Sequence, residues 1–246
     1  YNSVPISNSG VALGIKRKTN IWSSLNKNGD NGISSIPSGY YTHSTYKPDA
    51  AHIAAMVGVG GGGAGYSGGK SPISSFLSIV GGFGGSSYIP QGFTGEVGTL
   101  TVPPNSDDSD IGLAAVGGVP DSGVTAAPGG NGGHARIIIT ANGSKTIFDY
   151  TGMDQSFTVP ESTTSIDIKM WGAGGGAGYS NPSYYSSSSC QGGAGAYVSG
   201  TLEVTPGEEL QIIVGQGGIG GQLSYDKPTD IPTIYGGGGF GGNING

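Results

Sequence analysis

The sequence predicts an all-β protein in which short strands lead into a bundle of extended, glycine-lined helices. The chain has 246 residues, and its 52 glycines gather in tracts. Apolar runs of strand length end directly in these tracts, and no segment shows the 3.6-residue period of an amphipathic α-helix. Proline and Asn-Gly signals separate the apolar runs, which is typical of short strands joined by turns.

Four apolar runs lead straight into glycine, which indicates a repeated strand-to-tract unit. The runs are 53–57, 111–116, 166–171 and 210–214. Asn142-Gly143, which follows a β-branched run, predicts a hairpin turn. The partial alternation of apolar residues favours a sandwich or barrel with one wet face. Further strands are expected at 97–102, 135–140, 146–150, 196–204 and 209–214.

An internal repeat at an offset of 57 supports this unit. Residues 93–118 align without gaps with residues 150–175, and Thr101-Val102-Pro103 matches Thr158-Val159-Pro160. Proline has no N–H to donate to a ladder, so it ends a strand. The repeat therefore predicts a strand, a polar turn and a second strand in each copy.

The glycine tracts predict polyglycine-II helices, with three residues per turn and no internal hydrogen bonds. A tract without Cβ atoms can bond to neighbours on all sides, and strands at its ends reduce the entropy that ordering must overcome. The alternative is a set of flexible linkers, because a lone glycine tract is disordered. The tracts that would supply the bundle are 58–65, 172–178, 192–195, 215–221 and 236–242.

Residues 148–180 and 192–221 resemble the glycine-rich domain of the anaplastic lymphoma kinase and leukocyte tyrosine kinase ectodomains. Their sequences are FDYTGMDQSFTVPESTTSIDIKMWGAGGGAGYS and GGAGAYVSGTLEVTPGEELQIIVGQGGIGG. Similar domains occur in bacterial and protist surface proteins. The resemblance implies a jelly-roll-type β-sandwich, like that of tumour necrosis factor, combined with packed glycine helices.

The order of the matching segments divides the chain into two portions. Residues 145–246 resemble the first half of such a domain, and residues 1–140 resemble the second half. NGGHARIII at 131–139 resembles the family's closing strand. Three arrangements follow: tandem partial domains, one domain in permuted order, or a domain completed by a neighbouring subunit.

Composition favours an extracellular, surface-located protein. Charged residues are only 11% of the chain, about half the usual share, and the net charge is −6. Because the one basic cluster is Lys16-Arg17-Lys18, nucleic acid is not an expected partner. No apolar run is long enough for a membrane helix, so membrane insertion is not expected.

The sequence offers no set of residues for catalysis, and we expect no enzyme, cofactor or resident metal. His43, His52 and His134 are scattered, without metal-ligand spacing. The glycine tracts superficially resemble phosphate loops, but no helix follows them. Asn105, Asp107, Asp108 and Asp110 could bind calcium, yet the EF-hand spacing is absent, which favours a plain acidic turn.

Three kinds of candidate site remain. Asn142-Gly143-Ser144 is an N-glycosylation sequon at a predicted turn. Cys190 is the one cysteine, so it is either a thiol for an intermolecular bridge or a small buried residue. Tyrosine anchors binding surfaces at low entropic cost, and the candidate contact loops carry Tyr40, Tyr41, Tyr46, Tyr179, Tyr184 and Tyr185.

Two functions fit these observations. The first is a non-catalytic structural protein that self-associates as a subunit of a surface fibre, layer or appendage. The second is a receptor-ectodomain or adhesin-type module that binds a protein or glycan through its tyrosine-rich loops. Low charge, repeats and abundant glycine favour the structural protein.

Overall fold

The computed structural model describes residues 14–17, 63, 81–82, 84, 92–120, 129–178, 190–221 and 235. These residues form two antiparallel sheets and contain no α-helix, so the predicted all-β class is confirmed. Tyr40, Tyr41, Tyr46, Tyr179, Tyr184 and Tyr185 lie outside the described residues, as do the tract at 236–242 and most of 58–65.

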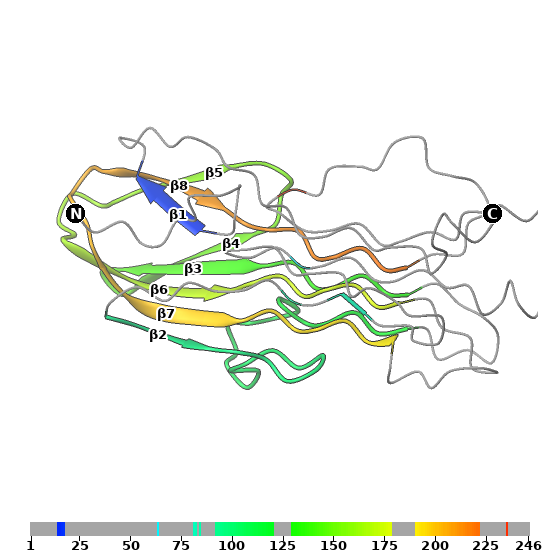
Figure 1. Cartoon of the computed structure of the whole chain (residues 1–246). Helices are drawn as coiled ribbons and strands as arrows, with labels where there is room; N and C mark the ends of the chain where they lie inside the picture. The colour runs from blue at the N-terminus through cyan, green and yellow to red at the C-terminus, as the bar shows by residue number, and fades with distance from the viewer. Residues whose placement is uncertain are drawn as a thin grey trace, which may run out of the picture.

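The larger sheet has five strands in the order β2-β7-β6-β3-β4 (Figure 1). Their bounds are β2 Phe93–Glu96, β7 Tyr197–Glu203, β6 Ser165–Trp171, β3 Arg136–Ala141 and β4 Ser144–Asp149. The smaller sheet has the order β1-β8-β5. Its strands are β1 Gly14–Arg17, β8 Glu209–Ile213 and β5 Gln155–Thr158.

The β3–β4 hairpin is closed by Asn142 and Gly143, as the sequence predicts. Their φ angles are 49° and 76°, and Ala141 pairs with Ser144 across the turn. Positive φ at both central positions is the requirement of a type I′ turn, which Asn-Gly meets with little strain.

Strands from the two predicted portions share both sheets within one chain. β1 pairs with β8 in the smaller sheet. In the larger sheet, β2 pairs with β7, and β3 pairs with β6. Each of these pairs joins a strand before residue 142 to a strand after residue 160.

Two apolar clusters cover opposite faces of the larger sheet. The main core contains Ile137 and Ile139 of β3 together with Leu210 and Ile212 of β8. On the other face, Ile138 packs with Trp171 and Tyr197 and with Ile111, Ala114 and Ala115 from the 104–116 segment. Both faces of β3 are therefore buried, which explains its unbroken isoleucine run.

The strand predictions at 97–102 and 111–116 are wrong. After β2 the chain makes a tight turn in which Thr99 and Val102 exchange backbone hydrogen bonds, and Leu100 has a φ of 52°. Residues 105–115 form successive turns, in which the N–H of Ile111 bonds to the carbonyl of Asp108 and that of Ala114 to Ile111. Asp and Ser side chains favour such turns. In this segment their preference outweighs the apolar pattern, from which the internal repeat predicted a second strand.

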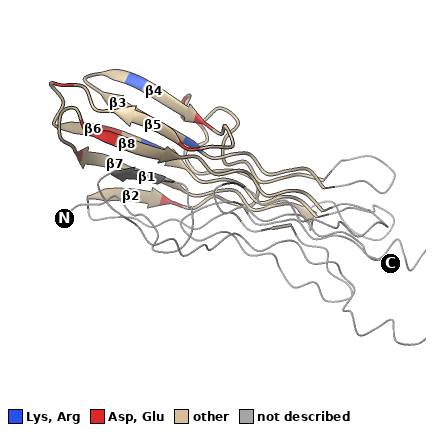
Figure 2. Cartoon of the chain, turned by 90° about the horizontal axis from the view of Figure 1, so that it is seen from above, with Lys and Arg blue, Asp and Glu red and all other residues tan. Residues whose placement is uncertain are grey.

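The glycine tracts run side by side beyond the ends of the strands (Figures 1 and 2). Tract 172–178 lies among the others and bonds to them through its backbone. Gly172, Gly175 and Gly178 donate to the carbonyls of Ala196, Gly193 and Cys190, so this neighbour is antiparallel. The donors are three residues apart, and so are the acceptors.

The same spacing recurs on the other sides of tract 172–178. Gly174 and Ala177 donate to Gly133 and Gly130, and the same two residues accept from Gly218 and Gly221. Gly82 and Gly118 donate to the carbonyls of Gly176 and Gly175. All these N···O distances lie between 2.7 and 2.9 Å. The tract is thus bonded to five neighbouring segments among the described residues.

Close approach of backbones makes glycine necessary at several of the bonded positions. A Cβ on Gly174 would overlap the carbonyl oxygen of Val116, one on Gly192 that of Gly175, and one on Gly217 that of Gly132. In each case the obstacle is backbone of another tract, which cannot rotate away as a side chain could.

We predict that Gly174→Ala lowers the free energy of unfolding by about 3 kcal/mol, because a methyl group must push two tracts apart. This loss corresponds to a fall of roughly 6–12 °C in melting temperature for a chain of this size. The control is Gly143→Asn: the position is open to solvent, and asparagine tolerates its positive φ. Calorimetry that gives equal melting temperatures for both variants would contradict the close packing of the tracts.

Candidate functional site

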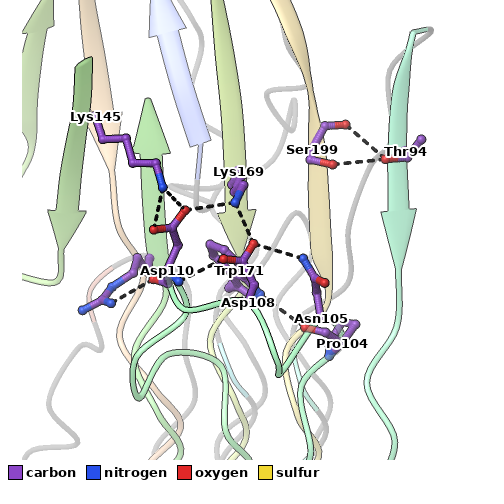
Figure 3. Close-up of polar contacts among 10 residues, drawn as sticks. Thr94, Pro104, Asn105, Asp108, Asp110, Lys145, Lys169, Trp171 and Ser199 are labelled. Atoms are coloured by element: carbon purple, nitrogen blue, oxygen red, sulfur yellow. Dashed lines mark hydrogen bonds and ion pairs between the residues drawn. The ribbon is translucent and has the colours of Figure 1, made fainter. Parts of the chain in front are cut away.

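The most elaborate polar arrangement in the described residues holds the 104–116 segment onto the outer face of the larger sheet (Figure 3). Nζ of Lys169 on β6 lies 2.6 Å from Oδ2 of Asp108 and 2.9 Å from Oδ2 of Asp110. Nζ of Lys145 on β4 lies 2.8 Å from the same Asp110 oxygen. We call these four residues the acidic clamp.

Local turn chemistry prepares the two carboxylates for the lysines. Oδ1 of Asp108 accepts the N–H of Asp110 at 2.9 Å, and Asn105 donates its amide to the other oxygen of Asp108 at 3.3 Å. Such side-chain-to-backbone bonds fix a turn that carries two like charges. The clamp therefore joins a self-contained turn to two separate strands.

Two further bonds hold the ends of the segment. Arg136 donates to the carbonyl of Asp110 at 3.0 Å while also forming an ion pair with Asp149. Trp171 donates its indole N–H to the carbonyl of Pro104 at 3.3 Å. The segment is thus attached to β3, β4 and β6 by side chains and closes over the apolar cluster around Ile138.

The clamp favours the ionised forms of Asp108, Asp110 and Lys169. Burial of Asp108 opposes ionisation, but the hydrogen bonds from Lys169 and from the N–H of Asp110 outweigh it, so the pKa of Asp108 is lowered. Hydrogen bonds from Lys145 and Lys169 lower the pKa of Asp110. The same contact with Asp108 raises the pKa of Lys169. The two carboxylate side chains are only 15% and 12% exposed, whereas the Lys145 side chain is 52% exposed, so water screens the Lys145–Asp110 pair more than the pairs of Lys169.

This arrangement is the acidic turn that the sequence analysis preferred over a calcium loop. Asp108 and Asp110 are bound to lysine ammonium groups, while Asp107 is exposed. In the described part of the chain, no group of three His, Cys, Asp or Glu side chains is placed to hold a metal ion. Chemically, the clamp can fix a segment in place.

The clamped segment and the turn before it carry most of the exposed large apolar side chains in the described residues. We call them the 97–119 apolar surface; their exposed fractions range from 36% to 86%. Sequence reasoning missed them because it placed these residues in strands with inward-facing side chains. The members are Val97, Leu100, Val102, Leu113, Val116 and Val119.

A second cluster lies where the strands meet tract 215–221. The His134 ring packs on Tyr150 with centroids 4.4 Å apart, and its Nδ1 accepts the N–H of Gly217 at 3.0 Å. Tyr150 donates to the Gln216 side chain, and Tyr235 bonds to Asp154. Desolvation lowers the pKa of His134, and burial followed by the contact with Asp154 raises the pKa of Tyr235. The spacing of these residues in the sequence gives no signal for this cluster.

Two sequence-predicted site residues lie among the described residues, apart from each other. Asn142 is exposed in the β3–β4 turn, where its side-chain amide donates to Thr163 at 2.7 Å. The same amide also donates to Ser162 at 3.3 Å, and a glycan on this nitrogen would leave one N–H for these two partners. Cys190 is fully buried, and its carbonyl accepts the N–H of Gly178. Its position fits a small packed residue, and a bridge to another chain would require the tract to open.

A family model described as a glycine-rich domain matches residues 150–246. This range begins just before β5 and contains β6, β7, β8 and the tracts at 172–178 and 215–221. Neither curated proteins nor solved structures give a match. No helix in the described residues is long and apolar enough to cross a membrane.

We predict that the acidic clamp stabilises the fold above about pH 4 and fails in acid. Because folding lowers the pKa of Asp108 and Asp110 from 3.8, the stabilisation is present above that value and is lost as pH falls through the folded values. At pH 7 the variant Asp108→Asn/Asp110→Asn should lose about 2 kcal/mol of unfolding free energy. Urea unfolding at pH 7 and pH 3 tests this.

The matched control for the clamp is Asp107→Asn, which removes a neighbouring, exposed carboxylate. It should unfold like the wild type at both pH values. A difference between the double variant and the wild type that is as large at pH 3 as at pH 7 would show that the carboxylate charges do not act as described.

We predict a separate, milder acid response from His134. A protonated imidazole donates from both nitrogens, so it cannot accept the N–H of Gly217. Folding lowers the pKa of His134 below 6.5, so its contribution is present above pH 6.5 and is lost as pH falls below it. The wild type should melt lower at pH 5.5 than at pH 7, and His134→Gln, which accepts without titrating, should show a smaller drop. Equal falls in melting temperature for the wild type and His134→Gln would show that His134 does not cause the acid response.

Proposed function

We propose that the chain is a non-catalytic extracellular structural protein, a subunit of a surface fibre, layer or appendage. The observation that carries this proposal is the bundle of tracts bonded to one another every third residue around residues 172–178. This is an extended, rigid element made of backbone rather than of reactive side chains. In the described residues, the best-formed polar cluster fixes one segment to a sheet.

The three-residue bonding interval supports the assignment of the tracts as polyglycine-II helices. An extended helix with three residues per turn returns the same edge to the same neighbour at every third position. The donors Gly172, Gly175 and Gly178 follow this rule on one side, and Gly174 and Ala177 follow it on another. Packed helices of this kind suit a load-bearing element, because many hydrogen bonds must break together.

The resemblance to the anaplastic lymphoma kinase and leukocyte tyrosine kinase glycine-rich region, and to related microbial surface proteins, points in the same direction. The family match over residues 150–246 supports the broader part of this statement, namely that this region is a glycine-rich domain. The two antiparallel sheets with a shared core support the jelly-roll-type sandwich that this resemblance implies. An extracellular location and self-association are parts of the same proposal.

Negative-stain electron microscopy of the protein, before and after concentration, tests the proposal. A structural subunit should form regular filaments or sheets with a constant repeat. Dispersed single particles at every concentration would instead favour the adhesin-type or receptor-type binding module. Those particles should then be screened against glycans and surface proteins.

A further inference from the structure

We propose that the 97–119 apolar surface is a self-association interface, and that its occupant is a second copy of this chain. The inference rests on the proposed structural function and names the face through which subunits meet. Three features of the described residues point to it: exposed apolar side chains, low charge beside them, and a turn with a positive φ that fixes the position of one of them.

The first feature is the concentration of apolar side chains on one segment. Six of the eight large hydrophobic residues that are exposed in the described structure belong to this surface. Figure 1 shows the segment, in teal to green, leaving β2 and looping beyond that edge of the sheet. Monomeric proteins rarely expose contiguous apolar patches above about 600 Å², and larger ones mark interaction sites.

The second feature is charge. Residues 97–104 and 111–120 contain no Asp, Glu, Lys, Arg or His, although the whole chain has a net charge of −6. Between them, Asp108 and Asp110 are paired with lysines, and Asp107 is exposed. Two copies of an acidic protein repel each other less where they meet over surface of low charge. A cationic partner would instead select an acidic face, so the low charge here favours another copy of the same chain.

The third feature is strain at an exposed residue. Leu100 has a φ of 52° and is 73% exposed. A left-handed conformation is costly for a side chain such as leucine, and it persists only where the surroundings impose it. The two-residue turn between Thr99 and Val102 requires this conformation at its first position, and the carbonyl of Leu100 also accepts the N–H of Ala194. The exposed leucine is therefore held at a fixed position on the surface.

The surface is also pre-organised, which reduces the entropy lost on association. The 99–102 turn is closed on itself, and Gly117 donates to the carbonyl of Thr101. The acidic clamp fixes the residues between these points to β4 and β6. The clamp therefore positions the residues of the interface.

A specific pair sets a size that this contact must reach. Specific interfaces bury at least about 1,200 Å² in total, so each copy must contribute about 600 Å². The same patch on both subunits gives a two-fold dimer. A filament would then need a second, different contact between dimers.

Sedimentation velocity on the full chain over a range of concentrations tests the interface. The variant Val97→Ser/Leu113→Ser/Val119→Ser replaces three members that are each more than half exposed. It should raise the dissociation constant at least 100-fold while melting like the wild type. The control Ile147→Ser/Met153→Ser replaces exposed apolar residues elsewhere, 51% and 65% exposed, and should associate like the wild type.

A second variant separates association from folding. Leu100→Asn removes an exposed side chain and relieves the left-handed strain, because asparagine tolerates this conformation. It should raise the melting temperature and still weaken association, which a purely structural role for Leu100 would not produce.

The outcomes distinguish the two levels of the proposal. If the wild type associates and the triple variant associates equally well, this interface is wrong while the structural function stands. If the wild type is a monomer at all concentrations, the structural function fails and the interface fails with it. If the triple variant associates more weakly than the wild type and the control variant does not, the result supports both the interface and the structural function.

Discussion

The whole structure depends on main-chain hydrogen bonding between glycine tracts. Tract 172–178 bonds to neighbours on several sides, and three of these neighbours bond to it at positions three residues apart. This is possible only because no Cβ stands between the backbones, as the overlaps at Gly174, Gly192 and Gly217 show. Ordering glycine is entropically expensive, so the bundle must gain from many bonds at once.

The strands reduce that entropic cost. β6 continues directly into tract 172–178, tract 190–196 continues into β7, and β8 leads through Val214 into tract 215–221. The sheet ladders therefore fix the spacing and direction of the tracts where they begin. The buried isoleucines of β3 hold the sheets together, and the 129–135 tract enters that strand. Packing in the sandwich and bonding in the bundle thus stabilise each other, and the acidic clamp adds one outer segment to this frame.

Local signals in the sequence predicted much of this fold, while contacts between distant residues escaped it. Asn142-Gly143 specified its hairpin because only positive φ closes a two-residue turn, and strand-to-glycine junctions located β6 and β8. The apolar run at 111–116 gave a wrong strand prediction, because Asp108, Ser109 and Gly112 favour turns. The buried side chains of this run cover the sheet from outside instead of belonging to a strand. The clamp could not be foreseen, because Lys169 and Asp110 lie 59 residues apart in the sequence. Likewise, no sequence pattern places the His134 ring beside Gly217.

Native-state hydrogen exchange of the amides in tract 172–178 tests the central claim most directly. These N–H groups belong to glycine and alanine, whose side chains bury little apolar area, so protection must come from the bonds between tracts. We expect Gly174, Gly175, Ala177 and Gly178 to exchange with opening free energies close to those of Ile137, Ile138 and Ile139 on β3, because bundle and sandwich open together. Exchange at the rate of an unstructured peptide in the tract, beside protected amides in β3, would contradict the account.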